Sequence, residues 1–172
     1  YNYTQYNPQR VYDWIATDFG VTCGLTKLAQ AAASGFKSPV FRGVVTGCPS
    51  SPLPALAPGN YVHYASHMWD LIVGAGDWKI FTDYGLPVIP PTEHEEKLGA
   101  SVRDSWLSLL YYGNITKLLP NWPDVRANGG DDYVVGVIGD DGVVQAVVNR
   151  KSDVCDLLQQ AGWGYEKYWW LN

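Results

Sequence analysis

The chain has 172 residues, of which 47% are hydrophobic, so it is long and apolar enough to form one domain with a core. Its net charge of −5, with no cluster of basic residues, argues against nucleic acid or an anionic membrane surface as a partner. No run of about 18 apolar residues occurs, so the sequence predicts no membrane-spanning helix.

Two helices and a strand are predicted near the N-terminus. Asn7 followed by a proline is typical of a helix start, and apolar residues at helical spacing then continue to Gly20, where we expect the helix to end. Thr22 is suited to cap a second helix, which Gly35 terminates. Residues 39–46 are rich in β-branched side chains and predict a short strand.

Two proline-rich loops precede the next helix. Residues 47–60 contain four prolines, and residues 83–91 contain three. Long irregular loops in compact domains are often functional, so the first loop and the residues after it are candidates for a site.

A long helix then begins with a capping box, in which Thr92 caps the helix and Glu95 reaches back to the cap. Gly113 is expected to close it. We expect an apolar stripe to face the core, with polar side chains on the opposite face. The stripe comprises Leu98, Val102, Trp106, Leu109 and Leu110, and the polar face comprises Lys97, Ser101, Arg103, Asp104 and Ser108.

The last part of the chain predicts a β-hairpin and a helix. Valine-rich runs within residues 132–149 flank the turn sequence Gly-Asp-Asp-Gly at 139–142, and residues 151–161 form the helical pattern. Repeated β-α-β units are absent, and one strand with a hairpin does not make an independent parallel sheet. This pattern favours a fragment of an α/β fold over a self-sufficient domain.

The three histidines are candidates for acid–base chemistry, because the unperturbed pKa of the histidine side chain is about 6.5, close to the pH at which enzymes work. In a serine hydrolase, such a histidine moves a proton between the serine hydroxyl and the leaving group. His94 lies in the capping-box turn between two glutamates, which indicates a solvated surface residue. His63 and His67 follow the first proline-rich loop, where a histidine can reach over a nucleophile.

Two stretches resemble the C-terminal third of type-B carboxylesterases, the cholinesterase-like branch of the α/β-hydrolases. The first is Ser-His-Met-Trp-Asp-Leu at 66–71, similar to the family's His-Gly-x-Glu/Asp-Leu segment, which carries the triad histidine. The second is the helix and turn at 98–114 with Asn-Trp-Pro at 121–123, similar to the family's helix, Thr-Gly-Asn-Pro-like turn and Trp-Pro. The resemblance covers about residues 17–160.

The resemblance implies an α/β-hydrolase fold and ester hydrolysis by a serine mechanism, with no cofactor. The family's spacing favours His67 over His63 as the triad histidine. Met68 departs from the family, which has a small residue at that position. The chain contains no Gly-x-Ser-x-Gly nucleophile elbow, so the serine and the triad acid would belong to an upstream chain. Residues 1–172 would then be the C-terminal segment of a single α/β-hydrolase domain.

Several features point to secretion. Asn2 and Asn114 each begin an Asn-x-Thr glycosylation sequon. The chain starts at Tyr1 without a methionine or a signal-peptide pattern, so we expect it to begin after a cleavage.

Three cysteines allow one disulfide and one odd thiol, or a bond to another chain. In the family, a cysteine in a segment like Asp18–Cys23 bonds to one near the C-terminus, which implies a Cys23–Cys155 disulfide. Cys48 would then be free or paired with another chain. Pairing of Cys23 with Cys48 is the alternative. A bridge that closes such a long loop contributes about 4–5 kcal/mol in the chain-entropy model.

Other chemistry finds little support. The histidines and cysteines have no zinc-site spacing, and the Gly-Asp-Asp sequences at 129–132 and 139–142 are interpreted as turns and not as calcium loops. Two rival functions stay open. One is a non-catalytic relative that serves binding or adhesion, and the other is a secreted carbohydrate-binding module that uses the 8 Trp and 12 Tyr residues.

Overall fold

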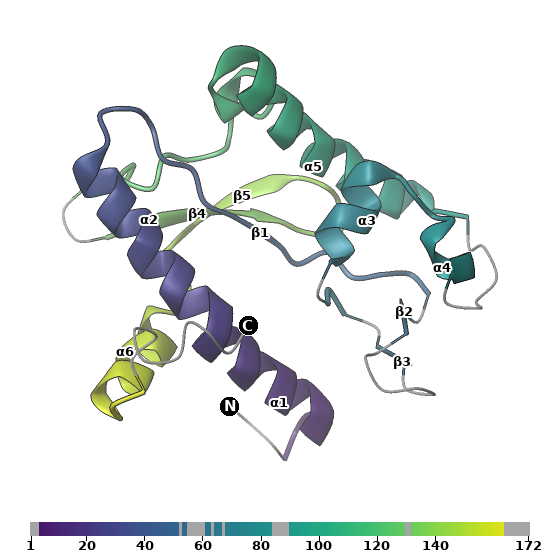
Figure 1. Cartoon of the computed structure of the whole chain (residues 1–172), viewed down its shortest axis with the longest axis horizontal. Coiled ribbons are helices and arrows are strands. Elements are labelled where there is room, and N and C mark those ends of the chain that lie inside the picture. The colour runs from purple at the N-terminus through teal and green to yellow at the C-terminus, as the bar shows by residue number, and fades with distance from the viewer. Residues whose placement is uncertain are drawn as a thin grey trace.

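The structure is a computed structural model of the chain (Figure 1). It describes residues 4–51, 53–54, 61–62, 64–66, 68–83, 90–129 and 132–163. The helices are α1 (Pro8–Thr17), α2 (Cys23–Gly35), α3 (Trp69–Ala75), α4 (Ile80–Asp83), α5 (Glu93–Tyr112) and α6 (Ser152–Gln160), with a π-helical segment η1 (Asp18–Thr22) and a 3₁₀ turn η2 (Ile115–Lys117). The strands are β1 (Gly43–Val45), β2 (Leu53–Pro54), β3 (Tyr61–Val62), β4 (Val134–Ile138) and β5 (Val144–Val148).

The centre of the fold is a three-stranded sheet in the order β1-β4-β5. β1 runs parallel to β4, with Gly43 opposite Gly136, and β4 pairs antiparallel with β5. The predicted hairpin is therefore confirmed. The strand predicted at residues 39–46 joins it in one mixed sheet, but this strand is shorter than predicted and comprises only Gly43–Val45. The sequence pattern did not predict this pairing, because it depends on residues about 90 positions apart.

Both faces of the sheet are covered, since residues that alternate along the strands enter two different hydrophobic clusters. Val44 and Val135 pack against the cluster that includes α2. Val45 and Ile138 pack against the cluster formed by α3 and α5. A central strand buried on both faces is typical of α/β architecture.

The first two predicted helices form one continuous helical unit, so the expected end at Gly20 is wrong. α1 passes through η1 directly into α2, and Thr22 has helical dihedral angles (φ −60°, ψ −49°) without a side-chain cap. The reason lies in tertiary contacts of η1 with the last helix. The carboxylate of Asp18 is almost fully buried and accepts a hydrogen bond from Lys151 Nζ at 2.8 Å. These contacts outweigh the local preference of glycine to end a helix.

The ends of α5 are as predicted, but its buried face is not. The capping box between Thr92 and Glu95 is present, and Gly113 ends the helix with φ 64°. The buried residues are Glu95, Leu98, Gly99, Val102, Ser105 and Ser108, whereas Trp106, Leu109 and Leu110 of the expected stripe are 37%, 45% and 80% exposed. Close packing on α3 explains the shift, because a Cβ on Gly99 would lie 2.3 Å from the carbonyl oxygen of Val73.

The disulfide joins Cys23 in α2 to Cys155 in α6, as the resemblance implied. Cys48 is the free cysteine of the described residues. The helix predicted after the hairpin is present as α6. The disulfide and the Asp18–Lys151 ion pair together connect both ends of the described chain.

The proline-rich loops fall only partly within the described residues. In the first, residues 53–54 pair with residues 61–62 as β2 and β3. Of the second, only residues 83, 90 and 91 are described. Within the described ranges, no helix is long and apolar enough to cross a membrane.

Candidate functional site

The two histidines favoured by the sequence, His63 and His67, both lie outside the described residues, as does Asn2. The structure instead describes the residues on either side of His67, which are Tyr64–Ser66 and Met68 onward.

A backbone hydrogen bond joins the described residues on either side of His67. The backbone N–H of Trp69 donates to the carbonyl oxygen of Ser66 at 3.1 Å, and Met68 has φ 66° and ψ 0°. These angles of Met68 lie in the left-handed region, which favours glycine. A left-handed residue with a side chain costs about 1–2 kcal/mol, and such residues cluster at functional sites.

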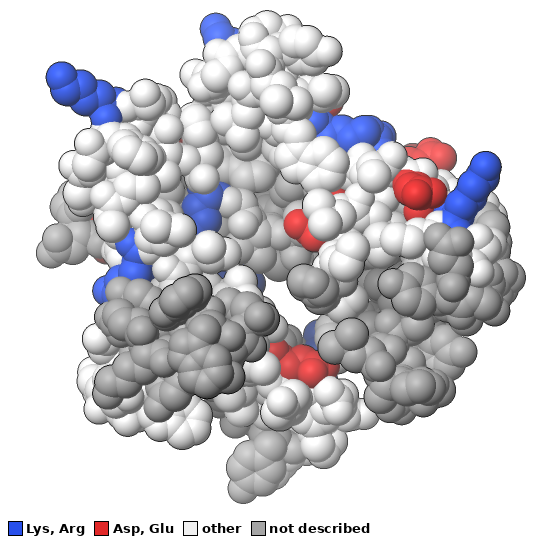
Figure 2. Space-filling view, viewed as in Figure 1, with Lys and Arg blue, Asp and Glu red and all other residues white. Residues whose placement is uncertain are grey.

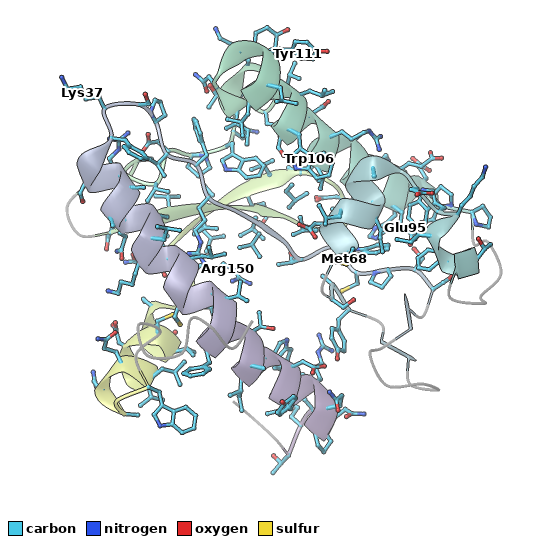
Figure 3. The ribbon with its side chains drawn as sticks, in the orientation of Figure 1. Lys37, Met68, Glu95, Trp106, Tyr111 and Arg150 are labelled. Atoms are coloured by element: carbon cyan, nitrogen blue, oxygen red, sulfur yellow. A yellow bond between two sulfur atoms is a disulfide. The ribbon has the colours of Figure 1, made fainter. Side chains whose placement is uncertain are left out.

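The residue after Met68 fixes the segment to the sheet. Trp69 is only 1% exposed, and its indole Nε1–H donates to the carbonyl oxygen of Gly47 at 2.9 Å. Gly47 lies two residues beyond the end of β1, and the Trp69 ring also packs edge-on against Trp78 at 5.9 Å between centroids. Figure 3 shows Met68 at the start of α3. The residues that follow His67 are therefore held at the carboxyl end of β1.

The residues that precede His67 are fixed to α1. The hydroxyl of Tyr64 donates a hydrogen bond to the carboxylate of Asp13. The guanidinium carbon of Arg10 lies 5.7 Å from the Tyr64 ring centroid and 4.8 Å from that of Trp14. Burial, the hydrogen bond to Asp13 and the negative charge of that carboxylate raise the pKa of Tyr64 to about 12. The hydroxyl therefore stays protonated and remains a donor at neutral pH.

His94 is not the solvated residue that the sequence indicated. Its side chain is 31% exposed, and Nε2 lies 2.9 Å from the carbonyl oxygen of Cys48 and 3.8 Å from Asp140 Oδ1. The backbone N–H of Cys48 also donates to Asp140 Oδ1 at 2.7 Å. His94 therefore holds the segment after β1 against α5 and the hairpin turn.

Glu95 has a second role that sequence reasoning missed. Its carboxylate accepts from the backbone N–H of Thr92 at 2.8 Å, which closes the capping box, and from the backbone N–H of Ser50 at 3.0 Å. The side chain is buried, and Figure 3 shows it at the end of α5 that lies near α3. The capping-box pattern was the only sequence signal for Glu95, and it predicts contacts within the helix alone.

Among the described residues, neither a metal-binding cluster nor a groove is found at the neighbours of His67. Within the described part of the chain, no cluster of three or more His, Cys, Asp or Glu side chains could hold a metal ion. An open groove of about 740 Å³ lies between α2, α6 and residues 125–126 and 132–133, with Thr26, Lys27, Arg126, Asp132, Asn149 and Asp156 among its lining residues. It contains none of the described neighbours of His67. The turn at 139–142 is confirmed by the hydrogen bond from Gly142 N to Gly139 O.

Asn114, the described sequon asparagine, directly follows the glycine that ends α5. Its Oδ1 accepts hydrogen bonds from the backbone N–H and the hydroxyl of Thr116, at 3.0 and 2.8 Å. The sequon therefore forms a compact turn at the start of η2.

Comparisons of the chain with models of protein families, with curated proteins and with solved structures find no match. The functional interpretation therefore rests on the sequence motifs and on the geometry of the described residues.

Proposed function

We propose that this chain is the C-terminal part of a secreted carboxylic ester hydrolase of the α/β-hydrolase fold, similar to type-B carboxylesterases. His67 is the triad histidine, and an N-terminal chain of the same enzyme supplies the nucleophilic serine and the triad acid. The substrate is a small-molecule or lipid ester, and the chemistry needs no cofactor.

The observation that carries this proposal is the backbone of Met68. The family motif has glycine directly after its histidine, and Met68 adopts the left-handed conformation that favours glycine. The glycine of the motif and the dihedral angles of Met68 both favour a left-handed backbone at this position.

The place of the turn in the sheet also supports the proposal. Ligands of open α/β sheets bind beyond the carboxyl ends of the strands. Trp69 holds the turn against Gly47, which lies beyond the carboxyl end of β1. Because β1 is parallel to β4, both strands end at this edge.

The β1 edge of the sheet is where we propose that the N-terminal chain joins. Among the described strands, β1 pairs only with β4, so its other edge is open for a further parallel strand. On α2, Leu25 and Leu28 are 48% and 64% exposed, which offers apolar area for the same partner. The Cys23–Cys155 disulfide is compatible with the oxidising route of a secreted protein.

In the proposed reaction, His67 removes the proton of the serine hydroxyl as it attacks the ester carbonyl. The resulting imidazolium then protonates the departing alcohol. In deacylation, His67 accepts a proton from the water that attacks the acyl carbonyl, and it gives this proton to the serine oxygen as the acyl–serine bond breaks and the acid product leaves. Tyr64 and Trp69 hold the residues on either side of His67.

The test begins with intact mass spectrometry of the native protein, non-reduced and then reduced. We expect a partner chain that contains Gly-x-Ser-x-Gly. In the two-chain protein, His67→Ala should lower kcat for a p-nitrophenyl ester by about 10⁴-fold or more. The matched variant His63→Ala should retain kcat within a few-fold. Full activity of His67→Ala, or a partner without a nucleophile elbow, would contradict the proposal.

The sequence of the partner chain also distinguishes the proposed esterase from a non-catalytic relative, which would have the same fold without a nucleophile. The carbohydrate-binding alternative predicts a chain that folds alone and binds glycans. Isothermal titration of the isolated chain with oligosaccharides would show that binding.

A further inference from the structure

The C-terminal turn of α5 exposes three large side chains in a row. Leu110, Tyr111 and Tyr112 are 80%, 76% and 57% exposed. Figure 3 shows Tyr111 at the outer end of this helix, and the surface there is mostly uncharged in Figure 2. Single exposed apolar residues are ordinary, but three consecutive ones call for an explanation.

A glycosylation sequon follows this turn immediately, and its acceptor atom is available in the folded chain. Both hydrogen bonds of the Asn114 side chain are made by Oδ1, which faces Thr116. Nδ2 has no hydrogen-bond partner among the described residues. The only buried side-chain nitrogen or oxygen without a partner in that part of the chain is Arg10 Nε, so Asn114 Nδ2 reaches solvent. A sugar on Nδ2 would therefore displace no hydrogen bond of the described residues.

The chain also doubles back so that Asn114 lies beside the last turn of α5. Gly113, with φ 64°, reverses the backbone, and the carbonyl oxygen of Asn114 then accepts a hydrogen bond from Ser108 Oγ at 2.7 Å. Ser108 and Tyr112 are four residues apart and so share one face of the helix. Helical side chains lean toward the N-terminus, so the ring of Tyr112 covers the turn near Ser108.

These placements bring Tyr112 close to Asn114. The two residues are separated only by Gly113, so their Cα atoms are at most about 7 Å apart. Tyr111, three residues after Ser108, flanks the same face, and its ring centroid lies 6.4 Å from that of Tyr112. Tyr112 is the aromatic residue nearer to Asn114 along the chain, and the exposed Leu110, on the side of the helix opposite Ser108, is the matched control.

We propose that Asn114 carries an N-linked glycan and that the first N-acetylglucosamine packs on the ring of Tyr112. In the transfer, Nδ2 forms a bond to the anomeric carbon of a lipid-diphosphate-linked oligosaccharide. The bond from that carbon to the diphosphate oxygen breaks, the lipid diphosphate leaves, and Nδ2 loses one proton. The apolar C–H face of the sugar then lies on the electron-rich face of the tyrosine. This proposal requires passage through the secretory route but does not depend on ester hydrolysis.

The test uses the protein secreted in full by a eukaryotic host, trimmed enzymatically to one N-acetylglucosamine at each site. Peptide mass spectrometry should find one N-acetylhexosamine on Asn114. An unmodified Asn114 in the secreted protein would overturn the proposal.

Contact between the sugar and Tyr112 is tested by a double-mutant cycle with thermal unfolding. Tyr112→Ala should lower Tm by about 2–4 °C when the sugar is present. In the Asn114→Gln background, which has no sugar, the same substitution should have a clearly smaller effect. Leu110→Ala should change Tm equally in both backgrounds, and Tyr112→Phe should retain the sugar-dependent stabilisation. Equal effects of Tyr112→Ala with and without the sugar would overturn the contact.

Discussion

Ser108 offers a sharp test of how α5 is connected to the turn that follows it. Its side chain is completely buried, and its hydroxyl donates to the carbonyl oxygens of Asn114 and Ile115 at 2.7 and 3.0 Å. The same oxygen accepts from the backbone N–H of Leu118 at 3.2 Å. One hydroxyl therefore connects three backbone groups of the segment around η2 to the helix.

The expected cost of Ser108→Ala follows from these bonds. A typical hydrogen bond contributes about 0.5–1.5 kcal/mol, and partners left buried without a replacement cost about 1–3 kcal/mol. Alanine recovers about 0.5 kcal/mol through its higher helix propensity. The free energy of unfolding should therefore fall by about 1–2 kcal/mol.

Ser105→Ala is the matched control, because Ser105 is also buried on the same face of α5. Its hydroxyl donates only to the carbonyl oxygen of Val102, within the same helix, at 2.7 Å. We expect a change within about 0.5 kcal/mol. Urea unfolding followed by tryptophan fluorescence measures both variants. If Ser108→Ala and Ser105→Ala have equal effects, the connection of α5 to η2 through Ser108 does not stabilise the fold.

Two further predictions concern the N-terminal helices. The pKa of Tyr64 is raised from 10.0 to about 12, so the unfolded state loses this proton at a lower pH than the folded state, and the free energy of unfolding should fall between pH 10 and 12. Tyr64→Phe should reduce this fall, whereas Tyr12→Phe, at an exposed tyrosine, should not. Urea unfolding at a series of alkaline pH values measures both variants. An unchanged slope in Tyr64→Phe would contradict the assignment. Replacing Cys23 and Cys155 by serine should lower the free energy of unfolding by about 4–5 kcal/mol, measured by urea unfolding. Cys48→Ser should have a much smaller effect, and equal losses would argue against the disulfide.

Features that depend on a few neighbouring residues were predicted from the sequence. The capping box of Thr92 and Glu95 involves residues three apart, and Gly113 ends α5 through its own left-handed backbone. The hairpin follows from two valine-rich runs around a Gly-Asp-Asp-Gly turn. In each case the residues that make the structure are also the residues of the pattern.

Features that depend on a packing partner were not predicted from the sequence. The buried face of α5 is decided by how closely Gly99 approaches Val73, and nothing in the periodicity of α5 indicates which helix lies against it. The continuation of the first helix through Gly20 depends in the same way on contacts with α6, such as the Asp18–Lys151 ion pair.

The same division holds at the candidate site. The sequence indicated the segment around His67 as a candidate but did not predict the residues that bind Tyr64 and Trp69 on either side of it. Tyr64 bonds to Asp13, 51 positions away, and Trp69 bonds to Gly47, 22 positions away. The contact of His94 with Cys48 spans 46 positions, and for this reason a local view placed His94 in solvent.

Met68 shows how these long-range contacts shape the site. In the sequence, Met68 stands where the resembling family has a small residue, which predicts a different shape of the pocket. In the structure its backbone nevertheless has φ 66°, although an unstrained methionine avoids this region. A conformation that costs about 1–2 kcal/mol persists only where the surroundings enforce it. Here the hydrogen bond from Trp69 N–H to Ser66 closes the turn, and the bond from the Trp69 indole to Gly47 fixes it to the sheet. The surrounding fold therefore holds Met68 in a backbone conformation that favours glycine, although the residue is a methionine.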